Sequence, residues 1–469
     1  MATPDPRDET AQPDHPAKFS PRIMSLANGL ILLLAVLSAV LCLLGIMLEI
    51  QQGQTGFQSK TCWAFASLTV GLLAFRRFAG AAARLNLLAL LGSLALLELL
   101  LQVTAWLGLL PLVNTKERIP WGRVYWTAEG LGNSVRNREG WYYPEFHLAN
   151  TQRLAVIGDS FVEGVEVHRR RNLGVVLGER LQALAPGRAV LSLGSHGTGP
   201  AHYLEVLQHA QRHYAIREAV IVVYLGNDIT DCSPALYFLD PEQFIYYTRT
   251  PNGELILPPA GERARAAYER DLERSYQPVW HLLPRLLISH CMSVQIPLSV
   301  KNTLGLRRKM ATNKSHPTTQ VAGPETQLAA LGLKAAPFAV TPTPEVIEAM
   351  ALLKSLLERS ASYCQEQSIQ LRLMTIPFFP PDFYAQTNGP DWTAQLAGYD
   401  FLKPERELTQ WAEKNKIPIL PLGAVMQRSR MTPEQIRALY LSHGSGHFTE
   451  AGHRFAGEAL ATTFYEKAR

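Results

Sequence analysis

The sequence feature that most constrains the fold is a short apolar strand followed by a turn that contains a serine. Residues 153–157 form an apolar run rich in branched side chains, which is typical of a strand buried on both faces. Gly158-Asp159-Ser160 breaks the run, and a helical pattern follows. A serine at such a turn lies at the carboxyl edge of a parallel sheet, where open α/β sheets bind ligands. Because these three residues are also common in ordinary turns, the tripeptide needs support from the rest of the chain.

Strands and helices alternate after this turn. The predicted strands are residues 153–157, 189–193, 219–224, 369–376 and 417–420, and the predicted helices include residues 172–184, 201–214 and 450–465. This spacing predicts βαβ units and therefore an α/β fold with a parallel sheet. Residues 240–343 interrupt the alternation. We interpret them as an insertion with one helix, at about residues 278–290, and a flexible polar part.

The part of the chain before the sheet is predicted to be a membrane region. Residues 1–25 are polar and contain several prolines, as in a disordered tail. Residues 26–113 hold three apolar segments that could each cross a bilayer, at about 26–48, 57–75 and 85–112. The middle segment is the weakest, so two spans are the alternative. Residues 114–150 are interpreted as an aromatic-rich linker to a domain at residues 151–469.

Basic residues near the ends of the spans predict the orientation. Arg7, Lys18 and Arg22 precede the first span, only Lys60 lies near the first loop, and Arg76, Arg77 and Arg84 surround the second loop. Cytoplasmic loops are enriched in Lys and Arg. We therefore expect a multi-pass protein of the inner (plasma) membrane whose C-terminal domain is periplasmic or extracellular. With two spans the orientation would be reversed.

Charge and cysteine content exclude some classes of partner. A net charge of +5 on 469 residues, with no basic stripe interleaved with aromatics, gives no reason to expect nucleic acid. Five cysteines without a CxxC motif argue against a disulfide framework or a zinc site, and no metal or other cofactor is expected. One disulfide among Cys232, Cys291 and Cys364 stays open, because an oxidising compartment would permit it.

Four short blocks resemble, in their order, those of the SGNH hydrolase family, also called the GDSL esterases. The matching residues are Ser160 in Gly-Asp-Ser, Gly197 after the second strand, Asn227 in Gly-Asn-Asp after the third strand, and His447 before the final helix. The resemblance covers residues 151–469 apart from the insertion. It implies a flavodoxin-like α/β fold in three layers, with its site at the carboxyl edge of the sheet.

The resemblance also implies a role for each residue. Ser160 would be the nucleophile and His447 its base, since a serine hydroxyl needs a base with a suitable pKa. The backbone N–H groups of Ser160 and Gly197 and the side chain of Asn227 would form the oxyanion hole. Asp159 and Asp228 would support the site. A loop glycine with positive φ and a turn-capping asparagine are the alternatives for Gly197 and Asn227.

Two other histidines and a missing acid complicate this assignment. His443 is a weaker candidate for the base, and His453 is predicted to be structural because it falls inside the final helix. The family usually places an aspartate two or three residues before the histidine, where this chain has Gly444 and Ser445. A carbonyl could orient the ring instead, a distant acid such as Asp228 could substitute, or activity could be lost.

The sequence therefore favours a membrane-anchored acyl esterase or O-acyltransferase that works through a serine acyl-enzyme. Resemblance implies O-acyl (acetyl) groups of cell-envelope glycans as the substrate class. It also implies a multispanning membrane acyltransferase as a partner. The expected contacts are an acylated carbohydrate or another ester, and the lipid bilayer through the N-terminal helices. The alternative is a catalytically degenerate SGNH-fold scaffold or binding subunit of a membrane complex, which the missing acid motivates.

Overall fold

The computed structural model divides into two compact units, Met1–Leu101 and Gln102–Arg469. It describes residues 20–52, 57–107, 109, 113–114, 118–126, 130–149, 152–184, 186–236, 240, 242–277, 279–301, 332–378, 398–441 and 446–466. Most of the predicted disordered tail, most of the flexible part of the insertion, and His443 lie outside these residues.

The first unit consists of apolar helices. These are α1 (Pro21–Gln52), α2 (Phe57–Phe78) and most of α3 (Ala81–Trp106). Within the described residues, two helical stretches are long and apolar enough to cross a membrane: Pro21–Val40 of α1, and α3. The sequence predicted three spans, with the middle one weakest, and α2 is the helix that falls short. Apolar length alone is weak evidence of a membrane span, because a signal sequence or a core helix shares it.

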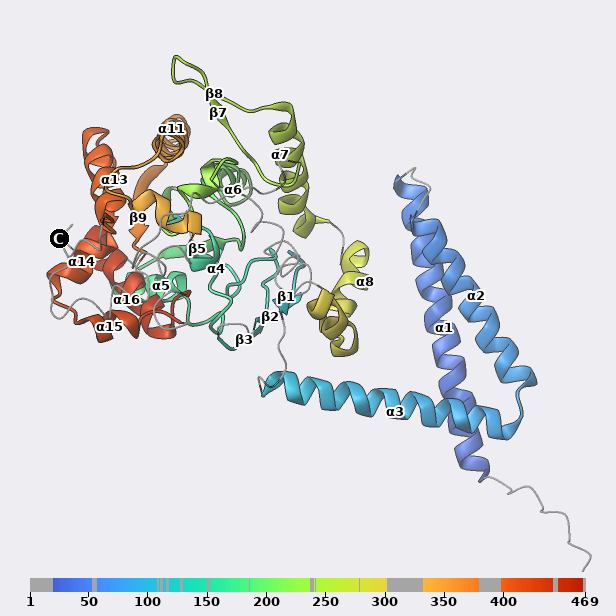
Figure 1. Ribbon diagram of the computed structural model, residues 1–469. Helices are drawn as coiled ribbons and strands as arrows, with labels where there is room; N and C mark the ends of the chain where they lie inside the picture. Colours follow the sequence, from blue (N-terminus) through green and yellow to red (C-terminus); the bar gives the residue numbers. More distant parts are fainter. Residues whose placement is uncertain are drawn as a thin grey trace, which may run out of the picture. The chain divides into compact units, whose positions relative to one another are not determined.

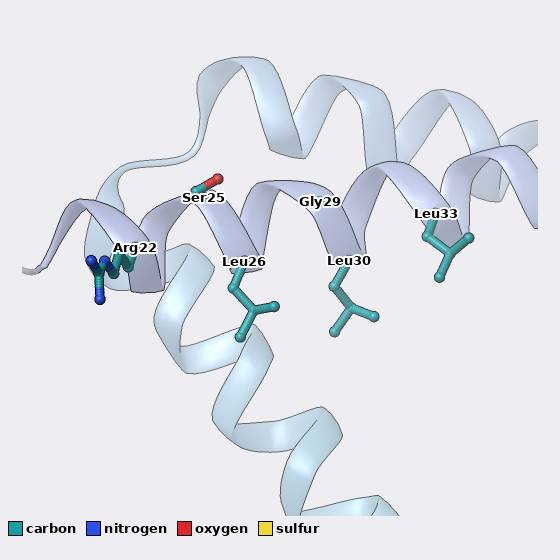
Figure 2. A pocket seen from close by; sticks show the side chains of 6 residues that line it. All are labelled: Arg22, Ser25, Leu26, Gly29, Leu30 and Leu33. Carbon is teal, nitrogen blue, oxygen red and sulfur yellow. The ribbon is translucent and has the colours of Figure 1, made fainter.

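One side of α1 carries a row of outward-facing leucines. Leu26, Leu30 and Leu33 recur at helical spacing and project from the same side of the helix (Figure 2). Leu26 is 66% exposed and Leu33 62% exposed. On α1 the buried positions include Ala27 and Ala35, and α1 packs against α2. Ile31, at 2% exposed, is also buried, so the buried side of α1 combines small and large residues while the leucine row stays exposed.

The second unit is built on a five-stranded parallel sheet with the order β10-β9-β6-β4-β5. Its strands are β4 (Gln152–Gly158), β5 (Arg188–Gly194), β6 (Glu218–Tyr224), β9 (Gln370–Ile376) and β10 (Ile419–Pro421), which confirms the five predicted strands. From β4 the chain passes first to β5 on one side and then to β6 on the other. The order of the strands thus reverses at β4, and ligands bind at such switch points.

Helices cover both faces of this sheet, which gives the three predicted layers (Figure 1). On one face α6 (Pro200–Tyr214) packs against α11 (Pro344–Glu366), and on the other α5 (Leu173–Leu184) packs against α16 (Glu450–Ala461). The apolar spacing explains the packing. In α5, for example, the fully buried Leu173, Leu177 and Leu181 lie on one face. Residues 154–157 of β4 are fully buried, so this strand lies at the centre of the core.

Part of the predicted linker is structured and belongs to the second unit. It forms a three-stranded antiparallel sheet from β1 (Val113–Asn114), β2 (Arg123–Trp126) and β3 (Gly132–Val135). These strands are short and mix polar with aromatic residues, so their pattern does not separate them from a loop.

The insertion holds more regular structure than its sequence indicated. The predicted helix at residues 278–290 is confirmed as α8 (Val279–His290), and residues 292–301 are also helical. Further elements of the insertion are β7 (Thr248–Arg249), β8 (Leu255–Ile256), α7 (Pro259–Leu272), η2 (Glu273–Tyr276) and η3 (Gly332–Phe338). Outside the insertion the unit also contains η1 (Thr230–Cys232), α13 (Lys403–Lys414), α14 (Leu422–Arg428), α15 (Pro433–Arg437) and η5 (Thr462–Glu466). Cys232, Cys291 and Cys364 are all free, which answers the question of a disulfide among them.

Candidate active site

Ser160 lies at the start of the short helix α4 (Ser160–Glu163), directly after the central strand β4. The preceding Asp159 caps this helix, since one of its carboxylate oxygens accepts a hydrogen bond of 2.9 Å from the N–H of Phe161. Gly164 ends the helix in the left-handed region, with φ 64°. The strand, the cap and the glycine together fix the serine at the carboxyl edge of the sheet, as the sequence predicts.

His447 meets Ser160 at this edge. Its Nε2 atom lies 2.8 Å from Oγ of Ser160, although the two residues are far apart in the sequence. The loop that carries the histidine is held by a 2.7 Å bond from the N–H of Leu441 to the carbonyl of His447. Thr449 then caps α16, because its hydroxyl accepts a bond from the N–H of Gly452. The pairing on which the sequence interpretation depends is therefore present.

The acid that the sequence seemed to lack is Glu166. Its Oε1 atom lies 3.1 Å from Nδ1 of His447, on the side of the ring away from Ser160, and its side chain is fully buried. An ionised carboxylate can only accept hydrogen bonds, so Nδ1 carries the hydrogen and Nε2 is left to accept the hydroxyl hydrogen of Ser160. Glu166, His447 and Ser160 thus have the geometry of a catalytic triad.

Asp228 does not take the position beside His447 that we considered for it. One of its carboxylate oxygens accepts a 2.7 Å bond from the hydroxyl of Tyr203, and the other accepts a 2.8 Å bond from the N–H of Tyr224. The side chain is fully buried. Burial, together with the nearby carboxylate of Asp159, raises the pKa of Asp228 well above its usual range. Asp228 is therefore a buried support of the third block, and Glu166 is the acid that contacts the histidine.

Asn227 lies among acidic side chains. Its Nδ2 atom donates a 3.0 Å bond to a carboxylate oxygen of Asp231. Burial raises the pKa of Asp159 to about 6, although the bond from Phe161, the charge of His447 and a hydrogen bond from Asn227 all oppose this shift. The structure thus brings Asn227 to the turn that carries Ser160. Its Nδ2 atom faces neighbouring carboxylates, whereas its Oδ1 atom, which a turn cap would use as the acceptor, is buried without a hydrogen-bond partner among the described residues.

The loop that contains Gly197 is tied to the nucleophile turn. Gly197 has φ 70°, a conformation that glycine adopts without strain, so the loop-glycine interpretation holds whatever its catalytic role. The N–H of Ser195 donates to the carbonyl of Gly158 at 3.1 Å, and the N–H of His196 donates to Glu163 at 2.8 Å. These bonds fix the loop beside the turn that carries Ser160.

A buried ion pair supports the loop that contains Gly197. Glu163 forms a 2.9 Å salt bridge with Arg136, and both side chains are at most 3% exposed. Because Glu163 also accepts the N–H of His196, one carboxylate joins the nucleophile helix, the Gly197 loop and the segment after β3. Removing either partner of such a pair would leave an uncompensated buried charge.

The small sheet β1–β3 supports the segment that carries the acid. A Cβ atom on Gly132 would lie 1.6 Å from the carbonyl oxygen of Val165, and one on Gly130 would lie 2.4 Å from that of Glu166. Only glycine permits so close an approach of the two backbones. The hydroxyl of Tyr142 donates to the carbonyl of Val167 at 2.9 Å. The predicted linker is thus the support on which Glu166 rests.

Aromatic and imidazole rings surround His447. The ring centres of Phe161, His196 and Trp126 lie 5.2, 6.1 and 6.3 Å from that of His447. The donor atoms of Glu166, His196 and His447 lie within 4.8 Å of one another, so this set could also hold a divalent metal ion. A second such set is His209, His213 and Glu273. The expectation that the reaction needs no metal ion therefore requires an experiment.

His453 has a structural environment, as its place inside the final helix predicts. It is fully buried in α16, and its Nδ1 atom accepts a 3.3 Å bond from the N–H of Leu173. It also packs under the turn that follows α4, since a Cβ atom on Gly164 would lie 3.0 Å from its ring. The histidine thus joins α16, α5 and the nucleophile turn.

Stability should depend on pH through this imidazole. Burial, and secondly the charge of His447, lower the pKa of His453 to about 3. Below about pH 6.5 the unfolded chain therefore binds a proton that the folded chain excludes, so the free energy of unfolding should fall by about 2 kcal/mol between pH 7 and pH 5 from this group. We expect urea denaturation at the two pH values to show a smaller decrease in His453→Gln than in the wild type. The exposed His147→Gln should keep the wild-type decrease, and an equal decrease in His453→Gln would contradict this account.

The fold was compared with known proteins. Neither protein-family models nor curated protein sequences give a match. Among solved structures, the chain is similar to a putative lipolytic protein of the G-D-S-L family from Desulfitobacterium hafniense DCB-2, with 11% identity and a TM-score of 0.32 over 67% of this chain and all of that one. It is also similar to TesA, with 11% identity and a TM-score of 0.31 over 67% of this chain and 99% of TesA.

An acetylxylan esterase, Axe2 from Geobacillus stearothermophilus, gives a similar match. Its identity is 12% and its TM-score is 0.30, over 67% of this chain and 94% of Axe2. Over two thirds of its length the chain is thus similar in structure to lipolytic proteins of the GDSL type and to acetylxylan esterases, at low identity.

Proposed function

We propose that this protein is an acyl esterase or O-acyltransferase that works through a covalent acyl-enzyme on Ser160. One observation carries the proposal. His447 lies between Oγ of Ser160, at 2.8 Å, and the carboxylate of Glu166, at 3.1 Å, so that each nitrogen of the ring has a partner suited to proton transfer. The buried acid beside His447 supports a catalytic site over a degenerate one.

The mechanism follows from the three contacts. Nε2 of His447 takes the hydroxyl proton as Oγ of Ser160 attacks the acyl carbon, and Glu166 stabilises the imidazolium that forms. The C–O bond of the ester then breaks, and the leaving alcohol takes the proton from Nε2. Water or an acceptor hydroxyl next gives its proton to Nε2 and attacks the acyl-enzyme. The bond between the acyl carbon and Oγ then breaks, Nε2 returns the proton to Oγ, and the acid or the new ester leaves with Ser160 and His447 restored. Hydrolysis and transfer differ only in which hydroxyl enters.

The oxyanion would be held by the N–H groups of Ser160 and Gly197 and by Asn227. Two observations support the loop N–H groups: the helix N-terminus at Ser160, and the bonds that fix the loop from Ser195 to Gly197 beside it. For Asn227 to contribute, its amide must turn from Asp231 to the oxyanion when substrate binds. Asp159 and Asp228 then act as buried supports of their turns.

Replacing Asn227 tests this third donor. Asn227→Ala should lower kcat about a hundred- to a thousandfold, because one of the groups that stabilise the developing charge is lost. The turnover of p-nitrophenyl acetate measures the effect. The matched change Asn415→Ala, at an exposed asparagine remote in sequence from the four blocks, should leave kcat unchanged. Wild-type turnover in Asn227→Ala would mean that Asn227 does not hold the oxyanion.

The place of action is the membrane surface. Support comes from α1 and α3, which are long and apolar enough to span, and from the outward leucine row of α1. We propose that the catalytic unit faces the periplasm or the exterior, with O-acyl (acetyl) groups of envelope glycans as substrate and a multispanning acyltransferase as partner. Protection of a tag at Arg469 inside the cell would contradict this orientation.

A serine-directed fluorophosphonate probe tests the function. Full-length protein in membranes should be labelled on the peptide that contains Ser160, and it should hydrolyse p-nitrophenyl acetate. An acetylated xylo-oligosaccharide is the glycan to try first. Added EDTA should leave the turnover unchanged, because no step uses a metal. A folded chain that is not labelled would contradict acyl-enzyme chemistry and favour the scaffold.

A further inference from the structure

The helical hairpin formed by α8 and residues 292–301, here called the insertion hairpin, buries Leu282 and Met292 but exposes a larger set of apolar side chains. The exposed apolar residues are Leu287 at 54%, Ile288 at 45%, Val294 at 39%, Leu298 at 39% and Val300 at 52%. Three polar residues are buried, since Ser289 is 6% exposed and Gln295 and Ser299 are each 1% exposed. Helices on the surface of a water-soluble protein usually turn their polar side chains outward and their apolar ones inward.

Hydrogen bonds hold the hairpin in this orientation. Nε2 of Gln295 donates to the carbonyl of Ile288 at 2.7 Å, which joins the two helices. The hydroxyl of Ser289 donates to the carbonyl of Leu286 at 2.7 Å and accepts the N–H of Arg123, at the start of β2, at 3.3 Å. The inward polar side chains therefore have partners. Turning the hairpin would break the bond between Ser289 and Arg123, so this bond favours the orientation with the apolar face outward.

The hairpin is also bonded to the end of a candidate membrane span. Within the second unit, Nε2 of Gln102, in the last turns of α3, donates to the carbonyl of His290 at 2.6 Å. Oε1 of the same side chain accepts a bond of 3.4 Å from Arg123. The apolar face thus lies on the part of the unit where the chain leaves α3. If α3 spans a bilayer, this part lies next to the surface of the bilayer.

The charge of the surrounding sequence fits an anionic surface. From Arg274 to Pro324 the sequence contains no Asp or Glu. The basic residues in the same stretch are Arg274, Arg285, Lys301, Arg307, Arg308, Lys309 and Lys314. Arg285 and Lys301, on the hairpin itself, are exposed. Apolar side chains flanked by basic ones, without acids, are typical of segments that lie in the interface of a membrane with anionic lipids.

We propose that the insertion hairpin lies in the interfacial layer of the bilayer that α1 and α3 enter, with its apolar face among the acyl chains and its basic residues at anionic headgroups. This inference rests on the proposed membrane attachment. It adds a contact made by the catalytic unit itself. That contact would fix the direction in which the triad faces the membrane surface, which a single connecting helix cannot do.

The exposed Cys291, between the two helices of the hairpin, offers a site for a reporter. Full-length protein is labelled with the fluorophore NBD and reconstituted in phosphatidylcholine–phosphatidylglycerol liposomes. The signal of a Cys291→Ser chain, labelled in parallel, is subtracted. Reconstitution should then shift the NBD emission to the blue. Lipids that carry a doxyl quencher near the headgroup should lower the NBD fluorescence. The matched reporter Ile347→Cys in the Cys291→Ser chain lies at another exposed apolar side chain, on α11, and should not respond.

The outcomes separate this inference from the proposed function. An NBD signal typical of water in a chain that floats with the liposomes would overturn the hairpin proposal and leave the anchor intact. A chain that does not float would overturn both the anchor and the hairpin. A blue-shifted NBD signal that the doxyl lipids do not quench, together with cross-linking of two chains through Cys291, would mean that this face is a contact between two copies of the chain. Quenching in a chain without fluorophosphonate labelling would support the hairpin and contradict the esterase.

Discussion

Glu166→Gln is expected to lower kcat about ten-thousandfold with little effect on folding. Glutamine fills the same space, but its amide can donate to Nδ1 of His447, which leaves the hydrogen on Nε2 and removes the base that Ser160 needs. The loss of the negative charge also leaves the imidazolium without its counter-ion. We expect kcat for p-nitrophenyl acetate to show this loss, while the melting temperature shows that the fold is intact.

Asp228, the other candidate for the acid, provides the control for this prediction. Asp228→Asn removes the carboxylate that we first considered, yet its oxygens bond to Tyr203 and Tyr224 and not to His447. We expect it to affect stability more than turnover. If Asp228→Asn were inactive while Glu166→Gln kept its turnover, the assignment of the acid would be reversed. The pH profile of kcat gives a second readout, because only the acid that contacts the imidazole should shift the titration of the base.

Ser160→Ala is expected to lower kcat about a millionfold and to abolish fluorophosphonate labelling. Without the Oγ atom no acyl-enzyme can form, and His447 can only assist the direct attack of water. Because the change removes a single atom from a residue that is 7% exposed, the fold should remain. Steady-state turnover, labelling and intact mass measure the three consequences. The matched change Ser429→Ala, at an exposed serine, should keep wild-type values.

Two results would contradict the assignment of the nucleophile. Labelling that persists in Ser160→Ala would mean that another hydroxyl reacts with the probe. Full turnover in the same variant would mean that the reaction does not pass through an acyl-enzyme on this residue. Either result would leave the 2.8 Å contact between Ser160 and His447 without a catalytic meaning.

The parallel sheet could be predicted because its strands are buried on both faces. Such strands appear as continuous apolar runs, and residues 154–157 and 219–223 are almost completely buried in the structure. The sheet β1–β3 could not be predicted in the same way. Its strands have two to four residues, and their burial comes from packing against the 164–167 segment, which no local pattern records. The charged helix α7 was missed because its sequence has few apolar residues.

Short motifs predicted Ser160 and His447, whereas no motif predicted Glu166. Glu163 and Glu166 both fall in an otherwise apolar stretch just after Ser160, and buried acids nearly always have a partner. That was the available signal. The spacing does not say which of the two faces His447 and which faces Arg136. The left-handed turn at Gly164 separates their directions, and the packing of β3 fixes them.

The small sheet before β4 has a consequence for shortening the protein. A chain that begins at residue 151 would keep every strand of the parallel sheet and all three members of the triad. It would lose Arg136, Tyr142 and the glycines that lie against Val165 and Glu166. Such a fragment should still bind its substrate but turn it over poorly, since nothing would hold the carboxylate against the imidazole. A soluble version suited to kinetic work should therefore begin before residue 118, ahead of Trp126 and both glycines.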